Sequence, residues 1–180
     1  IAGVLDIAGA AGAIVQPHRT DATLRVLPRY PAAPWAWNDV TPDFELPAAA
    51  VAVEGIEWLS RPDYNRVFVA GTTAGGVLGQ VTRAGTAGDA VAPMVTHPLI
   101  THADGARQRG LADLANTGRQ ALVSLRLQVL PETGVIVPGQ FVRYADGGDT
   151  RLGLVRSTAL DWQRPTLRQS ITLETHLAEA

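Results

Sequence analysis

The side chains with the most potential for chemistry lie together in one proline-rich stretch, residues 28–47. Two tryptophans are followed there by three carboxylic acids. Two carboxyl groups that face each other across a cleft can cleave a glycosidic bond, provided that their surroundings separate their pKa values. Tryptophan rings beside them would offer a sugar a flat apolar surface. The stretch therefore indicates a carbohydrate-binding or glycan-cleaving site formed by Trp35, Trp37, Asp39, Asp43 and Glu45.

The same stretch has a second interpretation, in which its aromatic residues anchor one chain to another. Its five prolines remove backbone donors and disfavour both helix and central strand, so we expect an extended, irregular segment. A large aromatic ring in such a segment packs into the chain's own core or into a neighbouring subunit. We favour this interpretation and keep the sugar site as the alternative. The predicted assembly-interface residues are Arg29, Tyr30, Trp35 and Trp37.

Metal and thiol chemistry find little support in the sequence. There is no cysteine, which excludes disulfides, thiolate nucleophiles and cysteine-based zinc or iron–sulfur sites. His97 and His102 are five residues apart, which is not the four-residue spacing of a helical metal pair. His18 and His176 are far from both in the sequence. We therefore expect no metal site.

Nucleophilic and phosphate-binding motifs are also missing. The serines include no Gly-x-Ser-x-Gly elbow. The glycine-rich stretches 71–79 and 147–148 lack the Gly-Lys-Ser/Thr ending of a phosphate loop, and the chain contains no lysine at all. Hairpin turns explain these glycines. We therefore expect no catalytic residue and no cofactor, and predict that the protein is not an enzyme.

Composition sets limits on partners and size. A chain of 180 residues fits one medium domain or two small ones. Its formal net charge of −2 gives it no overall attraction for a nucleic-acid backbone. Only 18% of residues are charged, which suggests surface covered by partner subunits. No stretch is apolar and long enough to span a membrane.

The hydrophobic pattern divides the chain near residue 60. Before it we expect a small-residue helix over 1–13, a short strand at 22–27 and the irregular segment 28–47. After it the pattern is β, as in the alternating strand from Ala121 to Val129. The sequence predicts an accessory N-terminal α/β segment, residues 1–60, and a larger β domain, residues 61–180.

One helix interrupts the β region. It is expected at about 101–117, with a capping-box-like start at Thr101 and a left-handed stop at Gly118. Asp146-Gly147-Gly148-Asp149 is a strong hairpin signal further on. Long alternating strands with one helix are typical of an antiparallel sheet that curls into a barrel. The fold class predicted is therefore mainly β (α+β), an antiparallel β-barrel with one packed helix.

Two motifs make this order of elements similar to that of a known protein family. The first is YNRVFVAG, Tyr64–Gly71, which opens a strand pair. The second couples the helix ADGARQRGLADLA, Ala103–Ala115, to the turn IVPGQFV, Ile136–Val142, after a long strand. With these motifs the chain resembles the baseplate hub proteins of tailed bacteriophages, the late-control-D-like family.

The resemblance implies a structural role in a virion. Such hubs are homotrimeric rings at the distal end of the tail, with barrel domains like that of the tail-tube protein and a lumen that passes DNA. They join the tail tube or the distal-tail protein to a central spike or fibre, and the tape measure protein is a further expected partner. Residues 61–180 would be one tail-tube-like barrel, and a preceding half of the protein would be missing from the printed sequence. The role of residues 28–47 is not carried over.

Overall fold

The computed structural model describes residues 2–146 and 148–177 and consists of two compact units. One unit combines Ile1–Pro34 with Pro62–Thr117, and the other combines Trp35–Arg61 with Gly118–Ala180. This division differs from the expected boundary at residue 60, because the strand Val51–Ser60 pairs with the strand Arg119–Gln128. The division into an accessory segment, 1–60, and a barrel domain, 61–180, stays a prediction.

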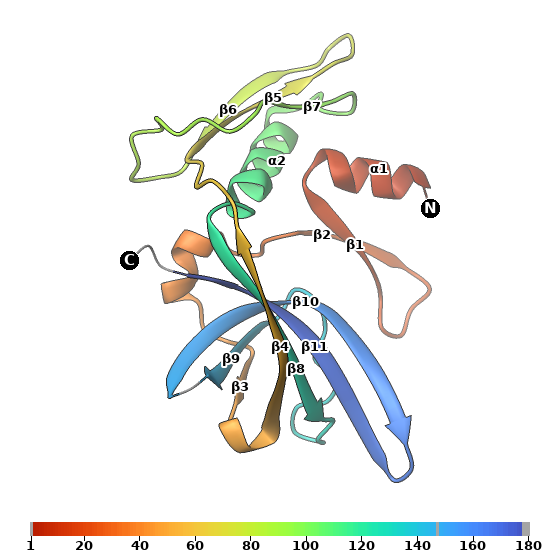
Figure 1. Cartoon of the computed structure of the whole chain (residues 1–180). Coiled ribbons are helices and arrows are strands. Elements are labelled where there is room, and N and C mark those ends of the chain that lie inside the picture. The colour runs from red at the N-terminus through yellow and green to blue at the C-terminus, as the bar shows by residue number, and fades with distance from the viewer. Residues whose placement is uncertain (1, 147, 178–180) are drawn as a thin grey trace. The chain divides into compact units, whose positions relative to one another are not determined.

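The first unit packs one long helix on a small sheet (Figure 1). Strand β5 lies between β6 and β7, and a separate hairpin pairs β1 with β2. Helix α2 packs on β5 and β6, where Gly110 allows close approach: a Cβ there would lie 2.5 Å from Val81 Cγ2. The elements are α1 (Ala2–Ala10), β1 (Ala13–Pro17), β2 (Leu24–Pro28), β5 (Arg66–Gly71), β6 (Leu78–Thr82), β7 (Val95–His97) and α2 (Ala103–Ala115).

Helix α2 confirms the predicted helix and corrects its start. The chain leaves the helix through Gly118, whose φ of 78° is the expected left-handed stop. The N-cap, however, is His102 and not Thr101, because His102 Nδ1 accepts a hydrogen bond from the Asp104 backbone N–H at 3.3 Å. An imidazole nitrogen here takes the place of the side-chain oxygen that usually caps a helix.

The second unit is built around one six-stranded sheet, in the order β3-β9-β10-β11-β8-β4. All neighbouring strands are antiparallel except β3, which runs parallel to β9. Figure 1 shows β10 and β11 as the longest hairpin of this unit. The elements are η1 (Pro34–Asp39), β3 (Phe44–Leu46), η2 (Ala48–Ala50), β4 (Val51–Ser60), β8 (Arg119–Gln128), β9 (Phe141–Asp146), β10 (Asp149–Gln163) and β11 (Thr166–His176).

Alternation along β8 forms the core of this unit, as the sequence pattern predicts. Val123, Leu125 and Leu127 are buried, and the residues between them lie on the opposite face. Ile171 and Leu173 on β11 extend the same apolar face, since they pair with Leu125 and Val123. Burial of these side chains is the main favourable contribution to folding of this unit.

Three expectations concern the remaining segments. Residues 28–47 are not simply extended, because they contain the 3₁₀ helix η1 and the short strand β3. The hairpin at 146–149 joins β9 to β10, although Gly147 lies outside the described residues. The fold is mainly β, as predicted. In the described register, β3 and β4 are the sheet's two edges and do not pair, so the closed barrel stays a prediction.

Candidate assembly surfaces

The predicted interface residues lie in two different units. Tyr30 is buried in the first unit, where its hydroxyl donates to Asn116 Oδ1 at 3.4 Å. Arg29 is exposed, with its guanidinium carbon 5.8 Å from the Tyr30 ring centroid. Trp37 is buried in the second unit, and Trp35 is half-buried. Their assignment to an assembly interface stays a prediction.

Arg29 and Tyr30 line a pocket of about 240 Å³ within the first unit. The pocket lies between the chain after β2 and one face of α2. Its lining residues are mostly glycine, alanine, leucine and proline, and Arg29, Tyr30 and Gln108 are the polar ones. The other lining residues are Gly12, Pro28, Pro31, Ala33, Leu111, Ala112 and Ala115.

Trp37 serves as a core residue and not as an open sugar platform. Its ring meets Phe141 edge-on, with centroids 5.4 Å apart and an interplanar angle of 82°. A second edge-on contact joins it to His176 at 4.9 Å and 79°. Edge-to-face packing of this kind adds to the gain from burial alone. The indole therefore fixes η1 to the sheet.

Two of the three acids after Trp37 also hold strands together. Asp43 Oδ2 accepts a hydrogen bond of 2.7 Å from the backbone N–H of Phe141. Glu45 Oε1 accepts one of 2.6 Å from Arg143. Both contacts join the segment around β3 to β9, so the two carboxylates are engaged in structure. No group of three or more potential metal-ligating side chains comes together among the residues described.

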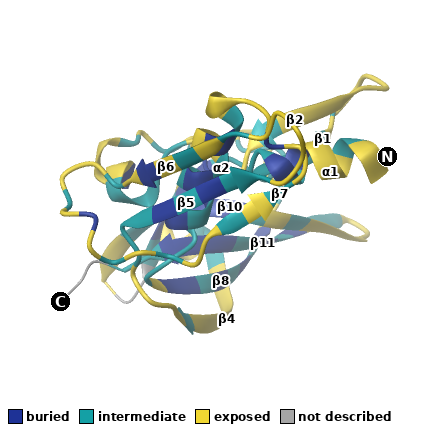
Figure 2. Cartoon of the chain, turned by 90° about the horizontal axis from the view of Figure 1, so that it is seen from above, coloured by how far each residue is buried: buried dark blue, intermediate teal, exposed yellow. Residues whose placement is uncertain are grey.

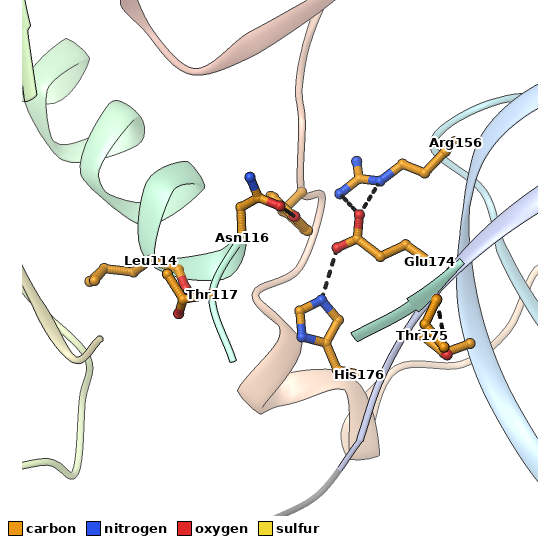
Figure 3. Close-up of polar contacts among 9 residues, drawn as sticks. Leu114, Asn116, Thr117, Arg156, Glu174, Thr175 and His176 are labelled. Carbon is orange, nitrogen blue, oxygen red and sulfur yellow. Dashed lines mark hydrogen bonds and ion pairs between the residues drawn. The ribbon is translucent and has the colours of Figure 1, made fainter. Parts of the chain in front are cut away.

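A buried ion network joins the end of β11 to β10 (Figure 3). The Glu174 side chain is only 4% exposed, and its Oε2 lies 2.6 Å from Arg156 Nε. Its Oε1 lies 2.8 Å from His176 Nε2. A buried carboxylate requires such partners to offset its lost hydration. Glu174 alternates with the apolar Ile171 and Leu173 along β11, and this pattern alone does not show that its carboxylate is buried.

Two further tryptophans, which the sequence does not mark as part of a site, are exposed. Trp58 on β4 is 59% exposed, and Trp162 near the tip of the β10–β11 hairpin is 70% exposed. Figure 2 shows β4 largely exposed beside the more buried β8. Val53, Ile56 and Leu160 accompany the two tryptophans as exposed apolar residues. Exposed apolar side chains grouped on strand edges indicate contact with another chain.

These residues lie at the two edges of a four-stranded antiparallel strip, which we define as residues 157–163 of β10 with β11, β8 and β4. The described register gives β4 a partner strand on one side only, β8. It pairs β9 with β10 only as far as Leu154, so β11 is the only strand paired with residues 157–163 in this register, although the Thr158 hydroxyl donates to Ile136 O at 2.8 Å. Ile56 and Trp58 lie opposite the buried Val123 and Ala121, and thus on the core face. Leu160 on β10 lies on the same face, because its partner Gln169 pairs with the buried Leu127. The apolar face therefore reaches both edges of the strip.

Comparison with known proteins finds a similar fold but no related sequence. No protein-family model matches the chain, and no curated protein matches it in sequence. The solved structure of a tail protein from Neisseria meningitidis MC58 matches with a TM-score of 0.51 at 13% identity, over 93% of this chain. This chain has the fold of a tail protein.

Two further structures resemble it more distantly. One is from the virion of a native gene transfer agent, with a TM-score of 0.49, 18% identity and 97% of this chain covered. The other is the 43 kDa tail protein of prophage MuSo2 from Shewanella oneidensis, at 0.45, 15% and 92%. This chain spans 52%, 38% and 49% of the three matched chains, about half of their length or less. No helix among the described residues is long and apolar enough to cross a membrane.

Proposed function

We propose that this protein is a structural, non-catalytic part of a phage tail, and specifically a baseplate hub. In this proposal three copies form a ring that joins the tail tube or distal-tail protein to the central spike or fibre at the distal end of the virion. The ring surrounds the channel through which DNA passes. The fold shared with a tail protein supports the general role. The observation that best supports a ring is the four-stranded strip, whose two outer strands each have an open edge.

Strand direction makes the two edges compatible. Each pairing within the strip is antiparallel, and the strip has an even number of strands, so β10 and β4 run in opposite directions. A neighbouring copy related by rotation would bring its β10 edge beside β4 in the antiparallel sense. Contacts of one edge with a different edge repeat around an axis and can close a ring. The predicted tail-tube-like barrel would then be completed by strands from several chains.

Burial of the apolar side chains at the two edges would stabilise this contact. Each buried tryptophan removes roughly 150–250 Å² from water, at about 25 cal/mol per Å². Trp58 and Trp162, on opposite edges, would each contribute several kcal/mol by this estimate. An open strand edge with apolar side chains is a liability in a monomer, because it pairs with any other exposed strand. Pairing between copies removes both edges together.

Cysteine cross-linking tests this contact directly, because the natural chain has no cysteine. In the variant Ile56→Cys with Leu160→Cys, the two thiols within one chain are at least three strand spacings apart, roughly 14 Å. They are also offset along the strands, because Leu160 aligns across the strip with Val51 and not with Ile56. A disulfide requires Cα atoms within about 7 Å, so any disulfide must join two copies. Oxidation should give a covalent trimer on a denaturing gel, whereas each single variant gives at most a dimer.

A matched control uses the opposite face of the strip. Glu57→Cys with Leu160→Cys places the two thiols on different faces, so it should remain uncross-linked under the same oxidation. Moving the second cysteine from Leu160 to Trp162 tests the neighbouring register on the same face. Absence of any cross-link in both core-face pairs would contradict the edge contact.

The mass of the intact protein tests the ring against the alternative. Light scattering should give three times the chain mass of 19.0 kDa. The alternative is a carbohydrate-binding or glycan-cleaving tail-tip module that uses Trp35 and Trp37. A monomer whose melting temperature rises with added polysaccharide would favour it. The buried position of Trp37 supports the structural role.

A further inference from the structure

Helix α2 presents two faces of small and apolar residues, and the sheet of the first unit covers only one of them. Ala106, Gly110 and Leu114 are buried on the face that packs on β5 and β6. Residues three and four apart share a face of a helix, which places a second stripe on the opposite side. This stripe lines the pocket of the first unit and consists of Gln108, Leu111, Ala112 and Ala115.

Two hydrogen bonds hold the other wall of the pocket in place. The backbone N–H of Arg29 donates to Gly12 O at 3.4 Å, which joins the chain after β2 to the turn before β1. The Tyr30 hydroxyl donates to Asn116 Oδ1 at 3.4 Å, which ties the same segment to the end of α2. Gly12, with a φ of 64°, lies so close to the helix that a Cβ there would be 2.6 Å from Ala112 Cβ. The pocket is therefore shaped by contacts within the unit.

The lining of the pocket carries one formal charge, which is positive. Arg29 is the ionised residue of the lining, and none of the described residues that form it is a carboxylate. The guanidinium carbon lies 5.8 Å from the centroid of the Tyr30 ring, which also lines the pocket, so the charge stays close to it. A guanidinium has five N–H donors and can bind a carboxylate while it keeps other contacts. A ligand that complements this pocket combines an apolar body with a negative charge.

Volume and exposure favour a side chain over a small molecule as the ligand. The pocket volume of about 240 Å³ lies below the roughly 300–1,000 Å³ of small-molecule sites. A cavity of about 150 Å³ accepts a benzene ring, so a phenylalanine or leucine side chain fits here with room for one polar group. The pocket is also open to solvent, since Pro28, Arg29, Pro31 and Gln108 are exposed whereas Tyr30, Ala112 and Ala115 are buried.

We propose that this pocket receives one bulky apolar side chain of a partner protein, and that a carboxylate beside this side chain pairs with Arg29. The pocket lies in the first unit and the proposed edge contact in the second, so the site goes beyond the ring. The choice of a protein as partner rests on the proposed structural role. The predicted interface residues Arg29 and Tyr30 thereby gain a ligand of stated chemistry, an apolar and acidic segment.

Three capped dipeptides test both parts of this chemistry on the intact natural protein. Acetyl-Asp-Phe-amide carries the carboxylate and the ring, acetyl-Asn-Phe-amide lacks the charge, and acetyl-Asp-Ala-amide lacks the ring. In two-dimensional NMR titrations the first should bind with a Kd of about 1 mM or tighter and shift the resonances of Gln108, Ala112 and Ala115. The Asn peptide should bind about three- to fivefold more weakly, because the arginine is exposed, and about 1 M salt should remove this difference. The Ala peptide should give no saturable shift.

Two arginine variants separate the pocket from net charge. Arg29→Gln should bind the Asp-Phe and Asn-Phe peptides equally well. Arg25→Gln removes the same charge from β2 but lies outside the pocket lining, so it should keep the preference of the natural protein. Equal affinity of the natural protein for the two peptides at low salt would overturn the proposal, whether or not Arg29→Gln folds. An unchanged preference in folded Arg29→Gln, or shifts confined to residues outside the pocket, would overturn it as well.

A free acid and the mass of the protein complete the test. Hydrocinnamate carries the ring and the carboxylate in one small molecule, and binding at least as tight as that of acetyl-Asp-Phe-amide would overturn the choice of a protein partner. Light scattering on the same samples distinguishes this proposal from the ring. A trimer that binds none of the peptides overturns the pocket proposal and leaves the ring intact. A monomer that binds acetyl-Asp-Phe-amide as expected supports the pocket and contradicts the ring.

Discussion

Glu174 provides the sharpest test of how the second unit is held together. Replacing it by glutamine keeps the shape of the side chain and removes its charge. Arg156, whose side chain is 17% exposed, then loses the carboxylate that neutralises it. The contact of 2.8 Å between Glu174 Oε1 and His176 Nε2 also loses its charge. The variant therefore removes the charge of Glu174 from beside a largely buried guanidinium.

The size of the effect follows from burial. Removing one partner of a buried ion pair costs about 3–5 kcal/mol, because the remaining charge stays out of water. Total stabilities of about 5–15 kcal/mol make this a large fraction. For a chain of this length, each kcal/mol lowers the melting temperature by about 2–4 °C, so the loss should reach roughly 6–20 °C.

Urea unfolding followed by circular dichroism measures the change. The matched control is Glu45→Gln, which breaks the ion pair to Arg143, where the two side chains are 41% and 69% exposed. An exposed pair of this kind contributes less than about 1 kcal/mol, so the control should be nearly neutral. Replacing Arg156 by methionine together with Glu174 by leucine should restore much of the stability. A cost below about 1 kcal/mol for Glu174→Gln would refute the role assigned to this network.

Two further predictions concern the first unit. Gly110→Ala should destabilise it by about 1–3 kcal/mol, because the new Cβ would lie 2.5 Å from Val81 Cγ2, whereas Gly105→Ala in the same helix meets nothing within 4 Å and should stabilise it in thermal melts. The hydrogen bond from Asn65 holds the pKa of Asp89 below its ordinary value of 3.8, with smaller contributions from backbone hydrogen bonds and a nearby arginine. Asn65→Ala should raise that pKa toward 3.8 in an NMR titration, and an unchanged value would contradict the assignment. Because the folded pKa is lowered, this contribution to stability is complete above pH 3.8 and is lost as the pH falls through the folded value.

Local features of the fold could be predicted from the sequence. The helix α2 and its glycine stop depend on contacts a few residues apart, and the alternation in β8 depends only on which face is buried. The sequence predicts the cap of α2 one residue early, at Thr101, because a histidine ring nitrogen takes the capping role that a threonine hydroxyl usually has. The mainly β class follows from the same local patterns.

Long-range features could not be predicted in the same way. An alternating pattern shows which face of a strand is apolar, but it does not show whether a neighbouring strand lies on each side. Trp37 and Trp58 therefore look alike in the sequence, although one is buried and the other is exposed. The parallel pairing of β3 with β9 joins residues about 98 positions apart, and no turn signal marks it.

The interleaving of the two units limits how this protein can be divided. The chain passes from one unit to the other after Pro34, Arg61 and Thr117. Neither unit is thus encoded by one continuous stretch of the gene, and a cut at any of these three points removes part of at least one unit. A single recombination event can therefore exchange the two units together, but it cannot exchange either unit alone.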